Sequence, residues 1–180
     1  MESGLVVSAF VGGFKDSKSL ADRAVAQLPD ERLYVAPDSN TNSIQVIMQH
    51  VAGNLRSRWT DFLTTDGEKP WRDRDREFEP RRIARAEILA DWESGWSVLF
   101  ATLASLRDDD MARPVTIRGH AMTVAAACSR SLSHCSYHAG QIVLVARVQA
   151  GADWKTLTVP PGGSERYNRE TWGPASKPGA

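Results

Sequence analysis

Four long stretches of the chain repeat their apolar residues at the spacing of an α-helix. They cover about residues 3–28, 43–64, 80–107 and 122–150. In the third stretch Trp92, Trp96, Leu99 and Leu103 recur three or four residues apart, so they share one helix face. Helices with one apolar face bury that face most readily against one another. The pattern therefore predicts an all-α protein built as a four-helix bundle.

The segments outside these helices differ in character. Residues 65–80 are rich in charge and contain glycine and proline, which favours a loop. Residues 113–122 alternate apolar and polar side chains, which predicts a short strand or hairpin before the last helix. The last 30 residues contain four prolines and no periodicity. We expect residues 1–150 to form the bundle and residues 151–180 to form an irregular C-terminal tail, packed on the same domain or trailing from it.

The composition of the chain argues against several classes of protein. The chain has 180 residues, which fits one domain, and its 22 basic and 22 acidic residues cancel. Zero net charge argues against a nucleic-acid binder. No run approaches the roughly 18 apolar residues of a membrane span, and Met1–Gly4 do not resemble the start of a signal peptide. Cys128 and Cys135 would lie about 10 Å apart along a helix, too far for a disulfide, so we expect free thiols and a cytoplasmic protein.

Two histidines near the C-terminus, His134 and His138, carry the clearest chemical signal. Residues four apart share one helix face, so both imidazoles can point at the same atom. His50 lies in the second predicted helix, and three imidazoles converge if that helix packs beside the last one. Three neutral nitrogens with an open position for water commonly hold a catalytic divalent metal. The alternative is a set of partly buried, hydrogen-bonded histidines, because the small residues around His134 also suit a tight helix crossing.

Other side chains could add a ligand, but their spacing does not select them. Cys135 could supply a thiolate, although a small buried core residue is the commoner interpretation. His120 lies in the alternating segment and is interpreted as a surface residue. A carboxylate could come from Asp61, Asp66, Asp73 or Asp75. Acids in a charged loop are ordinarily solvated.

Arginines near the second helix are the candidates for binding an anion. Arg56 and Arg58 flank its apolar stripe, and Arg72, Arg74 and Arg76 alternate with acids in the following loop. They could bind an anionic substrate or a thiol cofactor. Alternating charges usually pair with each other on a surface, so both interpretations stay open.

With these residues in view, the chain resembles the DinB/YfiT-like superfamily of bacterial metal-binding four-helix bundles. The resemblance rests on His50 within Val46–Asn54 and on His134-x-x-x-His138 followed by Gly140–Ile142. Either half of this motif is weak alone, whereas the combination is specific.

The resemblance extends from about residue 5 to about residue 168, and residues 55–71 resemble a subfamily of uncharacterised function. It implies a bundle with up-down-down-up helix order and a metal at one end of its crevice. The implied ligands are His50, His134 and His138, with water completing the coordination. Nickel, zinc, iron and manganese all suit such a site.

Relatives in the superfamily tend to be homodimers. Some are thiol-dependent transferases or isomerases that use bacillithiol or mycothiol, and others have no known activity. The chain is thus expected to form a homodimer and to bind a small-molecule substrate, but neither nucleic acid nor membrane. Trp71, Trp92, Trp96 and Phe100 offer apolar surface for a dimer, unless the tryptophans complete the core of the monomer.

Three functions remain in competition. The first is a metal-dependent enzyme, a low-molecular-weight-thiol S-transferase or a hydrolase, in which the metal activates a thiol or a water. The second is a non-catalytic metal-binding stress protein, which a fourth protein ligand such as Cys135 would favour. The third is a helical bundle without an ion, whose histidines only pack.

Overall fold

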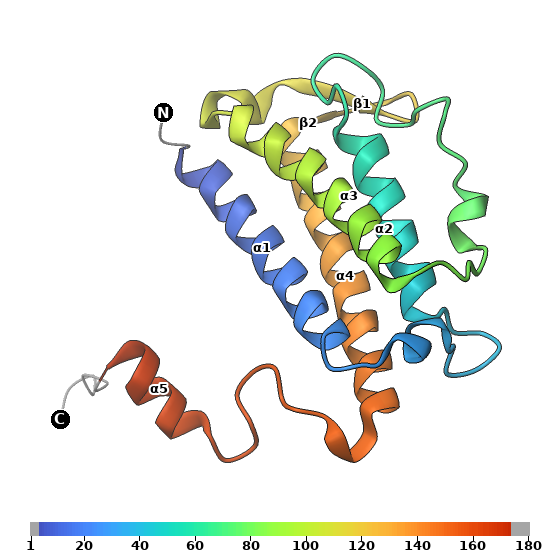
Figure 1. The fold of residues 1–180 in the computed structure, drawn as a ribbon. Coiled ribbons are helices and arrows are strands. Elements are labelled where there is room, and N and C mark those ends of the chain that lie inside the picture. The colour runs from blue at the N-terminus through green and yellow to red at the C-terminus, as the bar shows by residue number, and fades with distance from the viewer. Residues whose placement is uncertain (1–3, 174–180) are drawn as a thin grey trace.

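The structure is a computed structural model that describes residues 4–173, and within this range it is mainly helical (Figure 1). Its α-helices are α1 (Leu5–Val25), α2 (Ile44–Trp59), α3 (Arg85–Ser105), α4 (Val124–Ala150) and α5 (Ser164–Trp172). Its strands are β1 (Pro114–Ile117) and β2 (His120–Thr123). Short 3₁₀ helices lie at Asp30–Tyr34, Asp75–Phe78, Asp108–Ala112 and Gly151–Asp153. The all-α class and all four long helices that the sequence predicts are confirmed.

Hydroxyl side chains cap the first turns of two of the long helices. Helix α2 begins after Ser43, whose hydroxyl accepts a hydrogen bond from the amide of Val46 at 3.3 Å. Helix α4 begins after Thr123, whose hydroxyl accepts from the amide of Ala126 at 3.1 Å. Helix α3 starts later than the periodicity predicts. The residues just before it lie outside the helix, where the carbonyl of Ile83 accepts a hydrogen bond from Tyr34 and the amide of Ala84 donates to Glu87.

The long helices pack in pairs, α1 with α4 and α2 with α3, and α2 also packs on α4. Figure 1 shows that α1 and α4 run in one direction and α2 and α3 in the other. Phe14 lies edge-on to Trp59 and Trp96, with ring centroids 6.1 and 6.3 Å apart. These rings are fully buried at the centre of the core. Burial of such large rings contributes strongly to stability.

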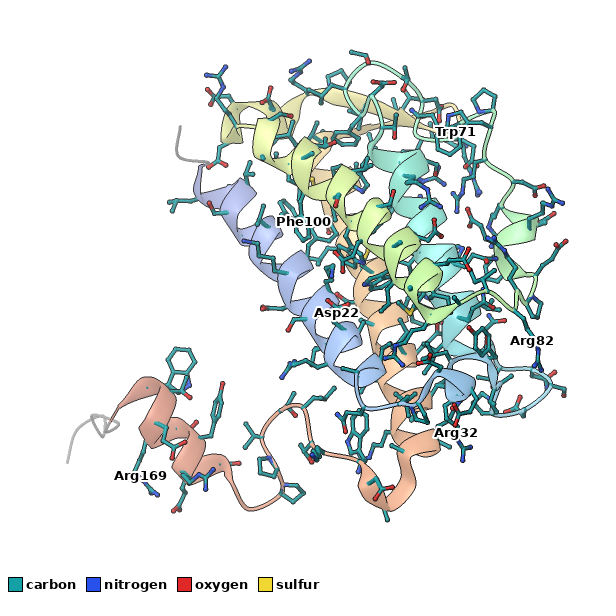
Figure 2. All side chains as sticks on the ribbon, in the orientation of Figure 1. Asp22, Arg32, Trp71, Arg82, Phe100 and Arg169 are labelled. Atoms are coloured by element: carbon teal, nitrogen blue, oxygen red, sulfur yellow. The ribbon has the colours of Figure 1, made fainter. Side chains whose placement is uncertain are left out.

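The aromatic residues that the sequence offers for a dimer divide between core and surface. Trp92 and Trp96 are 2% and 1% exposed, so they complete the core of the chain itself. Phe100 is partly buried against that core, whereas Trp71 is 58% exposed on the loop between α2 and α3, where Figure 2 labels it. Of the four, Trp71 alone therefore retains most of its apolar surface.

The predicted hairpin is present and is tied to the loop after α2. Strands β1 and β2 pair antiparallel, and their turn at Arg118 and Gly119 has φ angles of 56° and 75°. The carboxylate of Asp66 accepts hydrogen bonds from the amides of Glu68, Arg118 and Gly119 at 2.6, 2.8 and 2.7 Å. Asp66 thus fixes the hairpin turn over the end of α2.

The C-terminal tail is not irregular throughout, as the sequence analysis expected. Helix α5 forms within it, although none of its residues is buried. Two local ion pairs, Arg166 with Glu170 at 3.4 Å and Arg169 with Glu165 at 3.9 Å, join successive turns. A pattern of charges rather than of apolar residues marks this helix, so apolar periodicity does not predict it. The end of the tail, residues 174–180, lies outside the described residues.

The helices and the cysteines agree with two further predictions from the sequence. Within residues 4–173, no helix is long and apolar enough to cross a membrane. Cys128 and Cys135 are buried, free thiols, as their spacing predicted. Burial raises the pKa of each thiol to about 12, so both stay protonated at neutral pH.

Candidate metal centre

Three histidines from two helices meet at one point, where His50 is buried and His134 and His138 are half-buried. His50 comes from α2, and His134 and His138 come from successive turns of α4, which packs on α2. The Nε2 atom of His134 lies 3.2 Å from Nε2 of His50 and 3.2 Å from Nε2 of His138. One ligand atom from each residue lies within 4.8 Å of the others. The structure therefore brings together the three residues that the sequence selected.

Neighbouring side chains fix which nitrogen carries the proton in two of these rings. The carboxylate of Glu77 can only accept, so Nδ1 of His50 donates to its Oε2 at 2.9 Å. The amide of Gln141 donates from Nε2 to the hydroxyl of Tyr137 at 3.0 Å, which leaves its Oε1 to accept from Nδ1 of His138 at 2.7 Å. Both Nε2 atoms consequently present lone pairs toward His134.

His134 cannot donate a hydrogen bond to both of these lone pairs. Its neutral ring has one N–H, so at most one of the two facing lone pairs receives a hydrogen bond. Its Nδ1 is buried and has no hydrogen-bond partner. A divalent ion at the centre would instead accept all three lone pairs. Tetrahedral zinc with Zn–N distances near 2.0–2.1 Å places neighbouring nitrogens about 3.3 Å apart, close to the two 3.2 Å separations observed here.

The environment keeps two of these imidazoles neutral. Burial, together with smaller contributions from the nearby His138 and His50, lowers the pKa of His134 to about 3. Burial also lowers the pKa of His138, and it outweighs the opposing effect of the hydrogen bond that His138 donates to Gln141. A neutral imidazole is the form that binds a metal, so the two α4 residues are ready to act as ligands at neutral pH.

Glu77 is a functional candidate that the sequence analysis missed. It is buried, and Arg72 donates to both of its oxygens, from Nε and Nη2, at 2.8 Å each. Burial alone would raise the pKa of Glu77, but the hydrogen bonds from Arg72 and His50 outweigh this effect and lower it. The ionised carboxylate thus orients His50 in the way that carboxylates commonly orient metal-binding imidazoles.

The position of Glu77 depends on a glycine and a glutamine in α2. A Cβ atom at Gly53 would lie 2.2 Å from Oε1 of Glu77, so only glycine leaves room for the carboxylate there. The side-chain amide of Gln49 donates to the carbonyls of Arg76 and Glu77 at 3.0 Å each, and to that of Glu79 at 3.3 Å. Gly53, one turn after His50 in an otherwise uninterrupted helix, was the sequence signal of this close approach.

A pocket of about 180 Å³ adjoins the histidines. His50 and His134 line it, and its apolar wall includes Trp59, Phe62 and Ile117. Five arginines also line it: Arg58, Arg72, Arg74, Arg118 and Arg130. The site therefore opens onto a cationic pocket with an apolar side.

The other arginines that the sequence offered do not line this pocket. Arg56 pairs with Asp91, with Nη1 and Oδ1 2.6 Å apart. Arg76 is exposed and lies 4.0 Å from Asp73. The interpretation of alternating charges as surface pairs therefore holds for Arg76, and Arg56 is likewise paired with an acid.

The remaining ligand candidates lie away from the three histidines. His120 is exposed on β2, and Asp66 caps the hairpin turn. Cys135 is buried in the core, which confirms the commoner interpretation of that residue. Among histidine, cysteine and acidic side chains of the described part of the chain, the group that could hold an ion consists of His50, His134 and His138.

The fold and this site define a mainly helical protein with a three-histidine cluster able to hold a metal ion. Residues 3–163 match the family described as "Protein of unknown function (DUF1572)". The chain belongs to this family, which is DinB-like, so the resemblance seen in the sequence is confirmed at that level. No curated protein matches the chain significantly.

Proposed function

We propose that the protein is a DinB-type four-helix bundle with up-down-down-up helix order that binds a divalent ion through His50, His134 and His138. The ion is nickel, zinc, iron or manganese. The protein acts as a metal-dependent enzyme, a low-molecular-weight-thiol S-transferase or a hydrolase. The observation that carries this proposal is the convergence of three Nε2 atoms beside a pocket large enough for a small molecule.

The choice of an enzyme follows from the number of ligands. Structural zinc sites are usually closed by four protein ligands, whereas catalytic sites keep a position open for water or substrate. The cluster has three histidines, and Cys135 lies apart in the core with a protonated thiol. This arrangement favours an open site over that of a non-catalytic metal-binding stress protein.

In the proposed reaction the ion activates the nucleophile, and the side chains of the protein orient the ligands and limit water. A bound divalent ion supplies a Lewis acid that lowers the pKa of a water or a thiol, so that a nucleophile exists at neutral pH. Glu77 holds the proton of His50 at Nδ1, and Gln141 does the same for His138. Trp59, Phe62 and Ile117 limit water on one side of the pocket, which strengthens electrostatic interactions inside it.

Cobalt substitution tests whether the site is open and free of thiolate. We expect visible absorption bands of a cobalt ion bound by nitrogen and oxygen, without a thiolate charge-transfer band. A strong thiolate band that is lost in Cys135→Ser would contradict the open site and support a closed, structural one.

Reaction panels then test catalysis. The metal-loaded protein is mixed with low-molecular-weight thiols and a set of electrophiles, and separately with esters and amides. We expect turnover in one of the two panels, lost in His138→Ala and kept in His120→Ala, whose imidazole lies outside the site. Metal-loaded protein that is inactive in both panels would overturn the enzyme proposal.

A further inference from the structure

Five arginines from separate parts of the chain surround the pocket beside the histidines. They are Arg58 in α2, Arg72 and Arg74 in the loop that follows, Arg118 in the hairpin turn and Arg130 in α4. Like charges gathered in one pocket repel one another, and the repulsion is strongest where water is limited. No acidic residue lines the same pocket within residues 4–173. This positive charge must therefore be balanced by acidic residues outside the pocket lining or by a bound ligand.

Two carboxylates outside the pocket lining balance part of the positive charge. Glu68 accepts from Nη2 of Arg58 at 3.0 Å and from Nε of Arg118 at 2.7 Å. Glu77 accepts from Arg72, which is 2% exposed. Three guanidinium groups thus share two carboxylates, and one positive charge remains in excess among them.

Arg72 also has an unpaired donor, and Arg130 and Arg74 add further positive charge to the pocket. Nη1 of Arg72 is buried without a hydrogen-bond partner, and the nearest acid oxygen paired with it, on Glu68, lies 4.0 Å away. Arg130 is exposed and makes no hydrogen bond or ion pair with another described residue. Arg74 forms an exposed ion pair with Asp75 at 3.8 Å and lies over the ring of Phe78, 5.0 Å from its centroid. An incoming anion would gain several charge-assisted hydrogen bonds that the chain does not make for itself.

We infer that this pocket binds a small organic anion, whose carboxylate or phosphate group contacts Arg130 and Arg118 while its other end lies toward His50 and His134. The volume of about 180 Å³ limits the ligand to a small molecule, and Trp59 contributes an apolar wall for its carbon skeleton. The further statement that this anion is the enzyme's substrate rests on the proposed function. The statement that the pocket binds the anion does not depend on it.

The binding of two aromatic anions to metal-free protein, measured by calorimetry at fixed ionic strength, tests the inference. Benzoate and phenyl phosphate differ in their anionic group, so the two arms distinguish a carboxylate ligand from a phosphate ligand. Benzamide is the neutral control. We expect one of the anions to bind more tightly than benzamide, and its affinity to fall as salt is added.

Arginine variants distinguish binding of the anion in this pocket from nonspecific attraction of the anion to a positively charged surface. Arg130→Gln should weaken binding of the preferred anion about tenfold, as should Arg118→Gln, because each removes one charge-assisted contact. Arg147→Gln is the matched control, since Arg147 is exposed on α4 but does not line this pocket. The inference is overturned if neither anion exceeds benzamide, or if Arg130→Gln and Arg147→Gln weaken binding equally.

The same samples separate this inference from the proposed function. Anion binding that depends on Arg130 in protein that takes up no metal would support the pocket and reject the enzyme. Metal uptake without anion binding that depends on Arg130 would reject the pocket alone. In cobalt-loaded protein, a change of the visible bands on adding the preferred anion would support its contact with the centre.

Discussion

At the scale of single residues, the geometry of the candidate centre depends on the partners of its histidines. Glu77 and Gln141 fix the protonated nitrogen of His50 and His138, whereas Nδ1 of His134 has no partner. Partners of this kind raise the affinity of a histidine site for its metal. The loop that carries Glu77 is therefore part of the site, although it contributes no ligand.

Replacing Glu77 should weaken metal binding without removing a ligand. Glu77→Gln loses the negative charge beside His50 and one of the two acceptors for Arg72, so we expect metal affinity to fall about tenfold. Competition with a chromophoric chelator measures this change. Glu68→Gln is the control, because Glu68 pairs with arginines and contacts no histidine. An equal loss in both variants would contradict a specific role for Glu77.

Asp66 should make stability depend on pH. Hydrogen bonds from the amides of Glu68 and Gly119 hold its pKa below the ordinary value of 3.8. A carboxyl whose pKa is lower in the folded state stabilises the fold above its unfolded pKa, and this contribution is lost as pH falls through the folded value. Asp66→Asn should therefore be less stable than wild type at pH 7, with the difference shrinking below about pH 4. Urea unfolding at both pH values tests this, and a difference independent of pH would contradict it.

At the scale of elements, the crossing of α2 and α3 depends on one glycine. A Cβ atom at Gly95 would lie 2.8 Å from Cα and 2.9 Å from the carbonyl oxygen of Ala52, and backbone atoms cannot move aside cheaply. This contact holds α2, and with it His50, against α3. The close approach is possible only because position 95 lacks a side chain.

Gly95→Ala should destabilise the protein by about 1–3 kcal/mol through overpacking. Gly12→Ala in α1 is the matched control, because its Cβ atom would meet nothing within 4 Å. There the gain in helix propensity should stabilise the fold by about 0.5–1 kcal/mol. Chemical denaturation measures both changes, and equal stabilities of the two variants would show that the crossing tolerates a methyl group.

The contrast between the long helices and α5 shows why some parts of the fold and of the site could be predicted from the sequence and others could not. Apolar periodicity records burial along one helix, so the four long helices and the shared face of His134 and His138 were predictable. Helix α5 buries no residue and left no apolar pattern. Glu77 reaches His50 across 27 residues, and no spacing within the charged loop distinguishes it from its neighbours. Contacts of that kind depend on how the loop folds back over α2, which local patterns do not encode.

At the scale of the whole molecule, the exposed apolar side chains bear on the oligomeric state. Trp92 and Trp96 are buried inside the chain and are not available for a dimer. Other large apolar side chains stay exposed, including Trp71 on the loop and Leu144 and Val148 on α4. Exposed apolar surface is a common feature of subunit interfaces.

We expect a homodimer in solution, in line with the superfamily that the chain resembles. Light scattering coupled to size-exclusion chromatography should give a mass about twice the 19.8 kDa of one chain. Leu144→Glu, which places a charge on exposed α4, reports whether that face takes part. A single species of 19.8 kDa for the wild type would reject the dimer.

The most direct test of the metal centre is the metal content of protein purified without an affinity tag. Mass spectrometry of the wild type, His134→Ala and His120→Ala compares one histidine inside the site with one exposed outside it. We expect near-stoichiometric metal in the wild type and in His120→Ala, and its loss in His134→Ala. Wild-type protein that stays free of metal after nickel, zinc, iron and manganese are added, or equal metal in all three proteins, would contradict a centre built from His50, His134 and His138.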